Sequence, residues 1–257
     1  MLFCNIDLLD EKFETKRNQY VGVKDGRIAY IGASAPEEDF GERYDGRHRL
    51  LMPAFYNVHS HAPMTLLRGY AENLPLQRWL GEKVFPFEDQ IDDEAAYYGT
   101  LLAISEMLAS GTASFSDMYF FFGGMVPAIL ESGIKCNLSR GLTVFDDSDY
   151  TDLPAYRDNV RLRGEWNGAN NGRLIGDLCI HGEYTSNPKI VEAVAQHARE
   201  TGARIQIHLS ETQTEHEECK GRHGLTPAAY MEKHGIFDSP TTAAHCVHLT
   251  QEDMQLL

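Results

Sequence analysis

Two histidines one residue apart, His59 and His61, end an apolar run in the stretch FYNVHSHAPMTLLRG. Side chains alternate on an extended strand, so both imidazoles point to the same side and can reach one ion. Neutral imidazole is a good ligand for zinc or ferrous iron, and a catalytic metal site needs about three protein ligands and a position for water. The pair therefore suggests a metal site. For an isolated HxH, two core histidines bonded to backbone remain the alternative.

His208 and His245 follow later apolar runs, in IHLSET and AAHCVHL. If these runs are strands of one barrel, their ends converge on one axis. His59, His61 and His208 could then supply three ligands. Glu211 lies three residues after His208, where a carboxylate is suited to moving a proton between an activated water and a substrate. A solvated surface glutamate is the alternative interpretation of Glu211.

The eleven histidines fall into two groups. Six lie at or just beyond the end of an apolar run, where a barrel builds its chemistry: His59, His61, His181, His208, His245 and His248. The other five lie in expected helices or loops, and we expect them to be solvated on the surface: His48, His197, His216, His223 and His234.

The elements that would position these side chains alternate from Leu50 onward between β-like and helical runs. We expect strands at 50–59, 112–118, 135–142, 173–182, 204–211 and 241–249. We expect helices at 92–111, 125–133, 156–168, 187–202 and 226–235. In the first helix, Leu101, Ile104, Met107 and Leu108 form a stripe expected to face the core. The order predicts an α/β fold, a (β/α)₈ TIM barrel of which about six βα units are present.

Residues 1–50 differ from the rest, because they contain short strands and turns. QYVGVKDGRIAYIG predicts a hairpin that turns at Asp25 and Gly26. We therefore expect two domains, a small β unit at 1–50 and the barrel at 51–257. The chain ends in LTQEDMQLL, which is typical of the opening of a helix, so we expect Leu257 to be a truncation point.

The composition narrows the class of partner and the compartment. With 257 residues, 42% of them hydrophobic, the chain can bury a sizeable core. A net charge of −15 without a basic stripe argues against nucleic acid and anionic membranes, and favours a small-molecule ligand. Five scattered cysteines indicate a reducing compartment. The first residues do not form a signal peptide and no run approaches ~18 apolar residues, so we expect a cytoplasmic protein.

Four motifs in order, PAFYNVHSHAPMTLLRG, IHGEYTSNP, IHLSET and AAHCVHL, resemble the amidohydrolase superfamily. More narrowly, they resemble its cytosine-deaminase-like branch, which includes S-adenosylhomocysteine/5′-methylthioadenosine deaminases, guanine deaminases and triazine hydrolases. The resemblance covers essentially residues 1–257. It implies that the N-terminal β unit joins C-terminal strands in a small β-sandwich beside the barrel.

The resemblance also implies roles for the residues at the strand ends. His59, His61 and His208 would bind one divalent metal, with Zn²⁺ as the first choice and Fe²⁺ as the alternative. His245 would orient or polarise the attacking water. Glu211 would protonate the ring nitrogen beside the carbon under attack.

Three residues match substrate contacts of the family. His181 matches a substrate-contacting histidine, with a satisfied core histidine as its alternative. Glu88 matches a glutamate that binds ribose hydroxyls, with a solvated loop carboxylate as its alternative. Trp79 lies in the same loop and would form a wall of the pocket, with simple packing as its alternative.

Two departures from the family pattern affect these implications. The family's metal site has an aspartate at the end of its eighth strand, and no residue of this chain can be assigned that role. Glu183 stands where many relatives have proline, which would add a charge near the mouth of the site.

The resemblance and the residues together predict a metal-dependent hydrolytic deaminase acting on a small heterocyclic amine. The first choice of substrate is an adenosine derivative such as S-adenosylhomocysteine or 5′-methylthioadenosine. Deamination of guanine or cytosine, or hydrolysis of a triazine, is the second. A metal-binding scaffold without catalysis is the third, and a homo-oligomer remains open. No GxxxxGK[ST] or GxGxxG motif indicates a phosphate site.

Overall fold

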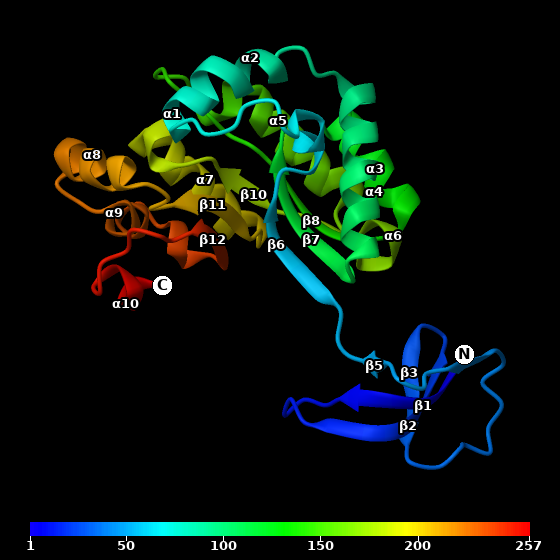
Figure 1. Ribbon diagram of the computed structural model, residues 1–257. Coiled ribbons are helices and arrows are strands. Elements are labelled where there is room, and N and C mark those ends of the chain that lie inside the picture. The colour runs from blue at the N-terminus through cyan, green and yellow to red at the C-terminus, as the bar shows by residue number, and fades with distance from the viewer. The chain divides into compact units, whose positions relative to one another are not determined.

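The computed structural model describes all 257 residues and divides into two compact units, Met1–Phe55 and Tyr56–Leu257. Each unit is described by itself. Figure 1 shows their strands and helices in order.

The N-terminal unit is one five-stranded sheet. Its strands are β1 (Leu2–Leu9), β2 (Thr15–Lys24), β3 (Arg27–Gly32), β4 (Arg43–Asp45) and β5 (Leu50–Leu51), in the order β3-β2-β1-β4, with β5 also on β1. Leu2, Cys4, Ile6 and Leu8 alternate along β1 and are buried. The expected hairpin is confirmed: β2 and β3 are antiparallel, and Asp25 and Gly26 both have the positive φ of a type I′ turn. The composite sandwich stays a prediction.

The larger unit contains two mainly parallel sheets. One has the order β6-β7-β8-β9 and the other β10-β11-β12. The strands are β6 (Phe55–Ser60), β7 (Thr112–Tyr119), β8 (Lys135–Arg140), β9 (Leu174–Gly176), β10 (Leu178–Ile180), β11 (Ile205–Leu209) and β12 (Thr241–His245). Parallel registers join β7 to β8, β8 to β9, β10 to β11 and β11 to β12. All six expected strand regions therefore contain strands.

The fourth expected strand, 173–182, is split in two at Asp177, which the sequence did not indicate. The Asp177 amide still donates to Leu138 of β8, whereas the Leu178 amide donates to Arg204 just before β11. The chain therefore changes ladder partner at this point and links the two sheets. The buried Asp177 carboxylate is bound by Arg204 and Gln206, which compensates its charge.

Helices follow the strands, as expected, and bury the sheet faces. They are α3 (Asp93–Ala109), α4 (Phe122–Ser132), α5 (Pro154–Arg161), α7 (Pro188–Thr201), α8 (Gln213–His223) and α9 (Pro227–Lys233), with short α6 (Ala169–Gly172) and α10 (Asp253–Leu256). In Figure 1, α3 and α4 lie beside each other, and they pack together. One apolar cluster includes Phe115, Leu138 and Ile129, and a second includes Ile180, Ile207 and Val194.

Two details of the helices correct the sequence analysis. The expected stripe of α3 is wrong at Leu108, which is 50% exposed, because the buried face is made of small residues such as Ala96, Gly99 and Ala103. A Cβ at Gly99 would lie 2.9 Å from the carbonyl oxygen of Pro63, so a larger residue does not fit there. Helix α8 was not expected, because its polar sequence QTEHEECKGRH has no apolar period.

The expectation that five histidines are solvated holds only for His48, which is exposed. His216 is buried on α8, and His197 is partly buried and contacts the Tyr150 hydroxyl. His223 and His234 are partly buried and hydrogen-bond to Glu183 and Glu192. For His197, His223 and His234 the expectation was wrong because a nearby hydroxyl or carboxylate lets helix packing bury the ring, whereas His216 is buried with its Nδ1 unpaired.

Candidate active site

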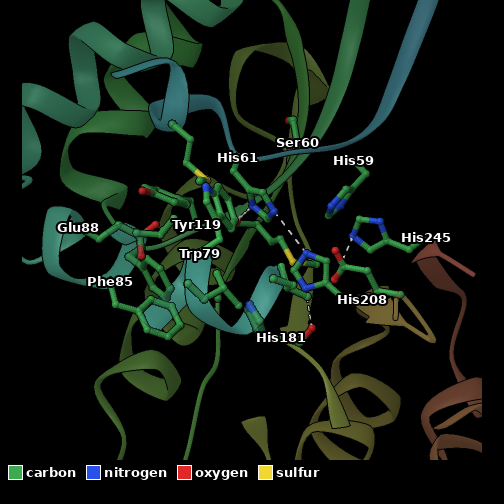
Figure 2. Close-up of a pocket in the computed structure, with 18 of the residues that line it drawn as sticks. His59, Ser60, His61, Trp79, Phe85, Glu88, Tyr119, His181, His208 and His245 are labelled. Carbon is green, nitrogen blue, oxygen red and sulfur yellow. Dashed lines mark hydrogen bonds and ion pairs between the residues drawn. The ribbon is translucent and has the colours of Figure 1, made fainter. Parts of the chain in front are cut away.

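A cavity of about 340 Å³ lies where strands of the larger unit end (Figure 2). Because the strands are parallel, their carboxyl ends share one edge of the unit. Every residue that the sequence analysis proposed for the site lines this cavity: His59, His61, Trp79, Glu88, His181, His208, Glu211 and His245. His248, the remaining strand-end histidine, is not among the lining residues.

The HSH segment, His59–His61, at the end of β6 is fixed from the neighbouring strand β7. The Ser60 hydroxyl lies 2.9 Å from the Ser116 carbonyl and 2.8 Å from Asp117 Oδ2, so its one proton is shared between these two acceptors, and the Ala62 amide donates to the same Asp117 oxygen at 2.6 Å. Asp117 is completely buried, and burial raises the pKa of its carboxyl to about 7. Sequence analysis missed Asp117, although it lies in the expected strand 112–118.

The rings of His61 and His208 are oriented by backbone carbonyls. His61 Nδ1 donates to the Met118 carbonyl and His208 Nδ1 donates to the His181 carbonyl, each at 2.7 Å. A carbonyl only accepts, so each Nδ1 carries the proton and each Nε2 has a free lone pair. The two Nε2 atoms are 3.3 Å apart. Burial lowers the pKa of both rings, so both are neutral at neutral pH.

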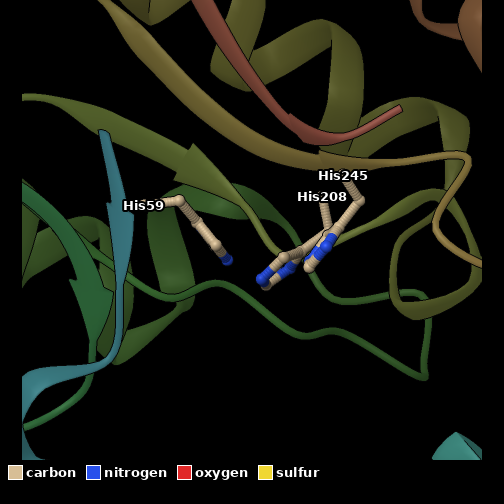
Figure 3. Close-up of side chains that lie close together, drawn as sticks. All are labelled: His59, His208 and His245. Atoms are coloured by element: carbon tan, nitrogen blue, oxygen red, sulfur yellow. The ribbon is translucent and has the colours of Figure 1, made fainter. Parts of the chain in front are cut away.

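His59 and His245 complete the group of four imidazoles. His59, His208 and His245 each offer a ring nitrogen, and these nitrogens lie within 4.8 Å of one another (Figure 3). Burial and the neighbouring histidines lower the pKa of His59 to about 4. His245 has a φ of 72°, a region that costs a non-glycine residue energy and that is frequent at functional sites.

This set of donors fits a divalent metal ion. Two neutral imidazoles whose lone pairs face each other at 3.3 Å repel, and a cation between them removes that repulsion. The Nδ1 bonds to carbonyls are also the usual arrangement of histidines that bind a metal through Nε2. The three residues whose nitrogens lie within 4.8 Å of one another include His245, whereas the sequence analysis chose His61 as the third ligand; the division of roles between these two stays a prediction.

Glu211 and His181 border the histidines. The Glu211 carboxylate lies 3.7 Å from His245 Nε2. His181 Nδ1 is 3.1 Å from the Thr185 hydroxyl, and burial lowers the pKa of His181 to about 4. His181 therefore presents a neutral ring to the cavity.

The other end of the cavity is apolar. It is formed by the short helices α1 (Leu76–Trp79), η2 (Leu80–Val84) and α2 (Phe85–Glu88), and Trp79 and Phe85 line it. Glu88 is 9% exposed, and burial raises the pKa of its carboxyl. Tyr119, at the end of β7, faces the same region and was missed by the sequence analysis.

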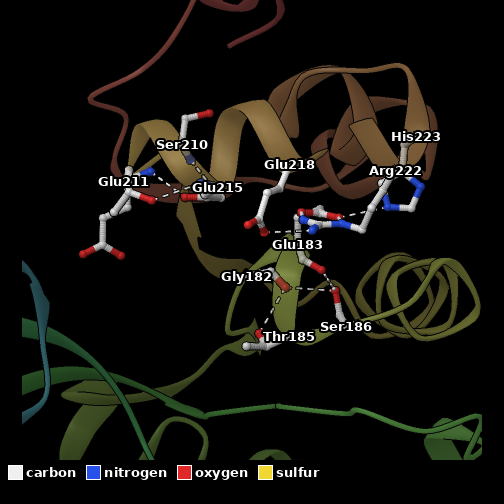
Figure 4. Close-up of polar contacts among 11 residues, drawn as sticks. Gly182, Glu183, Thr185, Ser186, Ser210, Glu211, Glu215, Glu218, Arg222 and His223 are labelled. Atoms are coloured by element: carbon white, nitrogen blue, oxygen red, sulfur yellow. Dashed lines mark hydrogen bonds and ion pairs between the residues drawn. The ribbon is translucent and has the colours of Figure 1, made fainter. Parts of the chain in front are cut away.

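The expected charge of Glu183 near the mouth is not found there. Glu183 is 2% exposed, does not line the cavity, and pairs with Arg222 at 2.6 Å and with His223 at 2.9 Å (Figure 4). Its charge is therefore compensated by α8. This pairing depends on a helix that the sequence did not reveal.

The larger unit consists of parallel strands that alternate with helices, and its histidine cluster lies at the carboxyl ends of the strands. This is an α/β fold of the TIM-barrel class with a candidate metal site at the usual edge. The sequence profile described as "Amidohydrolase family" matches residues 50–257. The chain belongs to the amidohydrolase family, as the motifs predicted.

A protein of Syntrophomonas wolfei subsp. wolfei named 5-methylthioadenosine/S-adenosylhomocysteine deaminase is 41% identical over 241 residues. The match covers 93% of this chain and 55% of that protein. A relative of the same name in Halothermothrix orenii is 33% identical, with 100% of this chain and 60% of that protein covered. The chain therefore spans a little over half the length of these relatives.

A guanine deaminase from C. acetobutylicum, solved with bound guanine, superposes with a TM-score of 0.88 at 20% identity. The match covers 99% of this chain and 64% of that chain. At this identity the likeness concerns the fold, and it confirms the predicted TIM-barrel class, of which the two sheets form an incomplete barrel. No helix is both long and apolar enough to cross a membrane.

Proposed function

We propose that the protein is a metal-dependent hydrolytic deaminase that releases ammonia from an aminated purine nucleoside such as S-adenosylhomocysteine or 5′-methylthioadenosine. One observation carries the proposal: a single cavity has five imidazoles and Glu211 at one end and the buried carboxylate of Glu88 at the other. The names of relatives at 38–41% identity support the same activity and substrate class.

His59, His61 and His208 would hold one divalent ion, for which zinc is our choice. A structure of an adenosine deaminase from Xanthomonas campestris, 24% identical, is described with bound zinc, which supports this choice. When bound, such an ion lowers the pKa of a water to about 7, so that hydroxide is available at neutral pH.

The side chains around the ion would orient the substrate and move protons. Glu211 would carry a proton to the ring nitrogen next to the carbon under attack, and His245, 3.7 Å away, would orient the attacking water. His181, whose neutral ring lines the cavity, would contact the purine. The products are a lactam and ammonia.

The far end of the cavity supports a nucleoside rather than a free base. A buried carboxylate without a cation partner accepts hydrogen bonds strongly, and ribose offers two adjacent hydroxyls to Glu88. Trp79 and its apolar neighbours would cover the sugar and its sulfur-containing substituent.

Ammonia release from a panel of substrates tests this function. The protein would be expressed as residues 1–257 and as the whole reading frame of its gene, loaded with zinc, and offered S-adenosylhomocysteine, 5′-methylthioadenosine, adenosine, guanine, cytosine and an aminotriazine. A Glu211→Gln protein serves as the matched inactive control. We expect the thio-nucleosides to be deaminated fastest.

The other outcomes would replace this proposal. Fast release from guanine or cytosine, or hydrolysis of the triazine, would move the function to the second class. Zinc binding without turnover of any substrate would favour a metal-binding protein that does not catalyse.

The cysteines are all free thiols, and a cytoplasmic location stays a prediction.

A further inference from the structure

Glu215 is a buried glutamate outside the cavity that no role described above explains. It lies in the first turn of α8 and is 3% exposed. A buried carboxylate is unfavourable unless it is hydrogen-bonded or paired. Its partners are two backbone amides: Ser210 N donates to Oε1 at 3.0 Å and Glu211 N donates to Oε2 at 2.7 Å (Figure 4).

These bonds are more than an ordinary helix cap. Thr212 is the N-cap of α8, and its hydroxyl accepts from the Glu215 amide at 3.1 Å, which is half of a capping box. In that motif the glutamate accepts from the amide of the N-cap residue itself. The Glu215 carboxylate also reaches one and two residues further back, into the segment that carries Glu211.

The Ser210–Glu211 segment held in this way is strained, and its hydrogen bonds link Glu211 to the chain just after His245; Glu211 and His245 both line the cavity. Ser210 has a φ of 48°, in the left-handed region that non-glycine residues avoid. The two bound amides lie on either side of its Cα, so together they fix both adjoining peptide planes. The Ser210 carbonyl in turn accepts from Val247 N at 3.1 Å and His248 N at 2.9 Å, just after His245.

We propose that Glu215 is a positioning residue, whose carboxylate holds the Ser210–Glu211 turn so that the Glu211 carboxylate faces His245. The inference rests on the proposed function for the role of Glu211, and on the hydrogen bonds of Glu215 for the positioning. Without Glu215, Ser210 relaxes from its left-handed conformation and Glu211 turns away from His245.

The test compares Glu215→Gln with Glu217→Gln, an exposed residue two positions further along the same helix. The side-chain amide introduced by Glu215→Gln keeps the volume of the carboxylate but offers only one acceptor oxygen to the two backbone amides. In the first arm, hydrogen exchange and a crystal structure report the turn itself. We expect the Ser210 and Glu211 amides to exchange at least about tenfold faster in E215Q, with Ile207 unchanged, and the distance from Glu211 to His245 to exceed 3.7 Å.

In the second arm, kinetics report the consequence for the reaction. We expect kcat to fall roughly 10- to 100-fold, as for a misplaced catalytic group, with KM and zinc content unchanged. In a Glu211→Gln background the same substitution should leave the residual rate, measured at high enzyme concentration, unchanged, because the group that it positions is already absent. E217Q should match the wild type in every measurement.

The results separate this inference from the proposed function. Unchanged amide exchange and an unmoved Glu211 would overturn the positioning role whether or not the protein is a deaminase. Faster exchange with unchanged kcat in an active enzyme would also overturn it. If the wild-type protein turns over no substrate, the proposed function fails, and the first arm alone decides the inference. If E215Q does not fold by circular dichroism, Glu215→Asp, which keeps the charge on a shorter side chain, takes its place.

Discussion

The two ends of the cavity are built in different ways. At the histidine end, β6, β11 and β12 deliver His59, His208 and His245, and backbone carbonyls of β7 and of the segment after β10 fix two of the four rings. At the apolar end, Trp79 and Glu88 lie on three consecutive short helical segments between residues 76 and 88. Rigid strands place groups that require exact geometry, whereas irregular segments vary with little effect on the fold.

The comparison predicts that substitutions at the histidine end remove the chemistry, and that substitutions at the apolar end change which substrate is preferred. Each of the following experiments tests one side of this division.

Replacing His208 should have the largest effect on zinc affinity, because its Nε2 lies 3.3 Å from His61 Nε2 and its ring contacts the rings of His59 and His245. For His208→Asn we expect zinc affinity to fall more than about 100-fold, since losing only an outer partner of a ligand costs about 10–100-fold. Competition with a chelator of known affinity measures this. His48→Asn, at an exposed left-handed position that asparagine tolerates, is the control. Unchanged zinc affinity in H208N would contradict the ligand assignment.

Asp117→Asn should have the next effect, because Asp117 binds Ser60 and Ala62, the two residues that flank His61, and has no hydrogen bond to either histidine ring. The amide keeps the shape of the carboxylate but loses its charge, so the bonds from Ser60 and Ala62 weaken. We expect zinc affinity to fall about 10–100-fold, with the melting temperature of the metal-free protein measured in parallel. A lower melting temperature with unchanged zinc affinity would mean that Asp117 serves packing only.

Stability against pH should also distinguish the two ends. Folding lowers the pKa of His59 and His181 from 6.5 to about 4, so between these values the unfolded chain binds more protons than the folded one. The contribution of these two imidazoles to stability is therefore lost as the pH falls from about 6.5 to about 4, whereas Asp117, whose pKa folding raises to about 7, acts in the opposite direction. Folding raises the pKa of Glu88, so its contribution is present at low pH and is lost as the pH rises through the folded value.

Melting temperatures of the metal-free protein between pH 7 and pH 4 measure the balance. We expect a decrease of a few degrees toward low pH, since about 1 kcal/mol shifts a domain of this size by roughly 2–4 °C. His181→Gln should flatten the decrease, and Glu88→Gln should steepen it. A decrease that His181→Gln leaves unaltered would show that other groups dominate.

The sequence was sufficient to predict which histidines gather in one cavity, because a single strand carries each of them there. The HxH spacing and the apolar runs before His208 and His245 led directly to a cavity that contains all of them. It failed where tertiary contacts decide. Asp117 acts through a hydrogen bond to Ala62, which is far away in the sequence, and no local pattern marks this partner. Glu215 lies on helix α8, which the sequence analysis did not expect, so its hydrogen bonds to the segment before that helix were missed as well. The burial of His216 and the pairing of Glu183 were misjudged for the same reason.

Glu88→Gln tests the apolar end, and its effect should be selective. If Glu88 accepts from ribose hydroxyls, losing the charge of this acceptor should raise KM for nucleosides about tenfold, the size of a charged hydrogen bond, with kcat little changed. KM for a free base should not change, because the base has no ribose. Asp89→Asn, the exposed neighbour, is the matched control. Equal increases of KM for nucleosides and bases would exclude a ribose contact.

Trp79→Leu should have the smallest effect, and it separates two roles of one side chain. Trp79 lines the cavity, but it also packs against a cluster that includes Leu67, Val84 and Ile91. If Trp79 is a wall for the substrate, KM should rise less than about tenfold, and more for 5′-methylthioadenosine than for adenosine, because only the former adds an apolar group to contact it. If packing is its only role, the melting temperature falls and both substrates change equally. The second result would confine substrate choice to Glu88 and would leave the apolar end with a structural role.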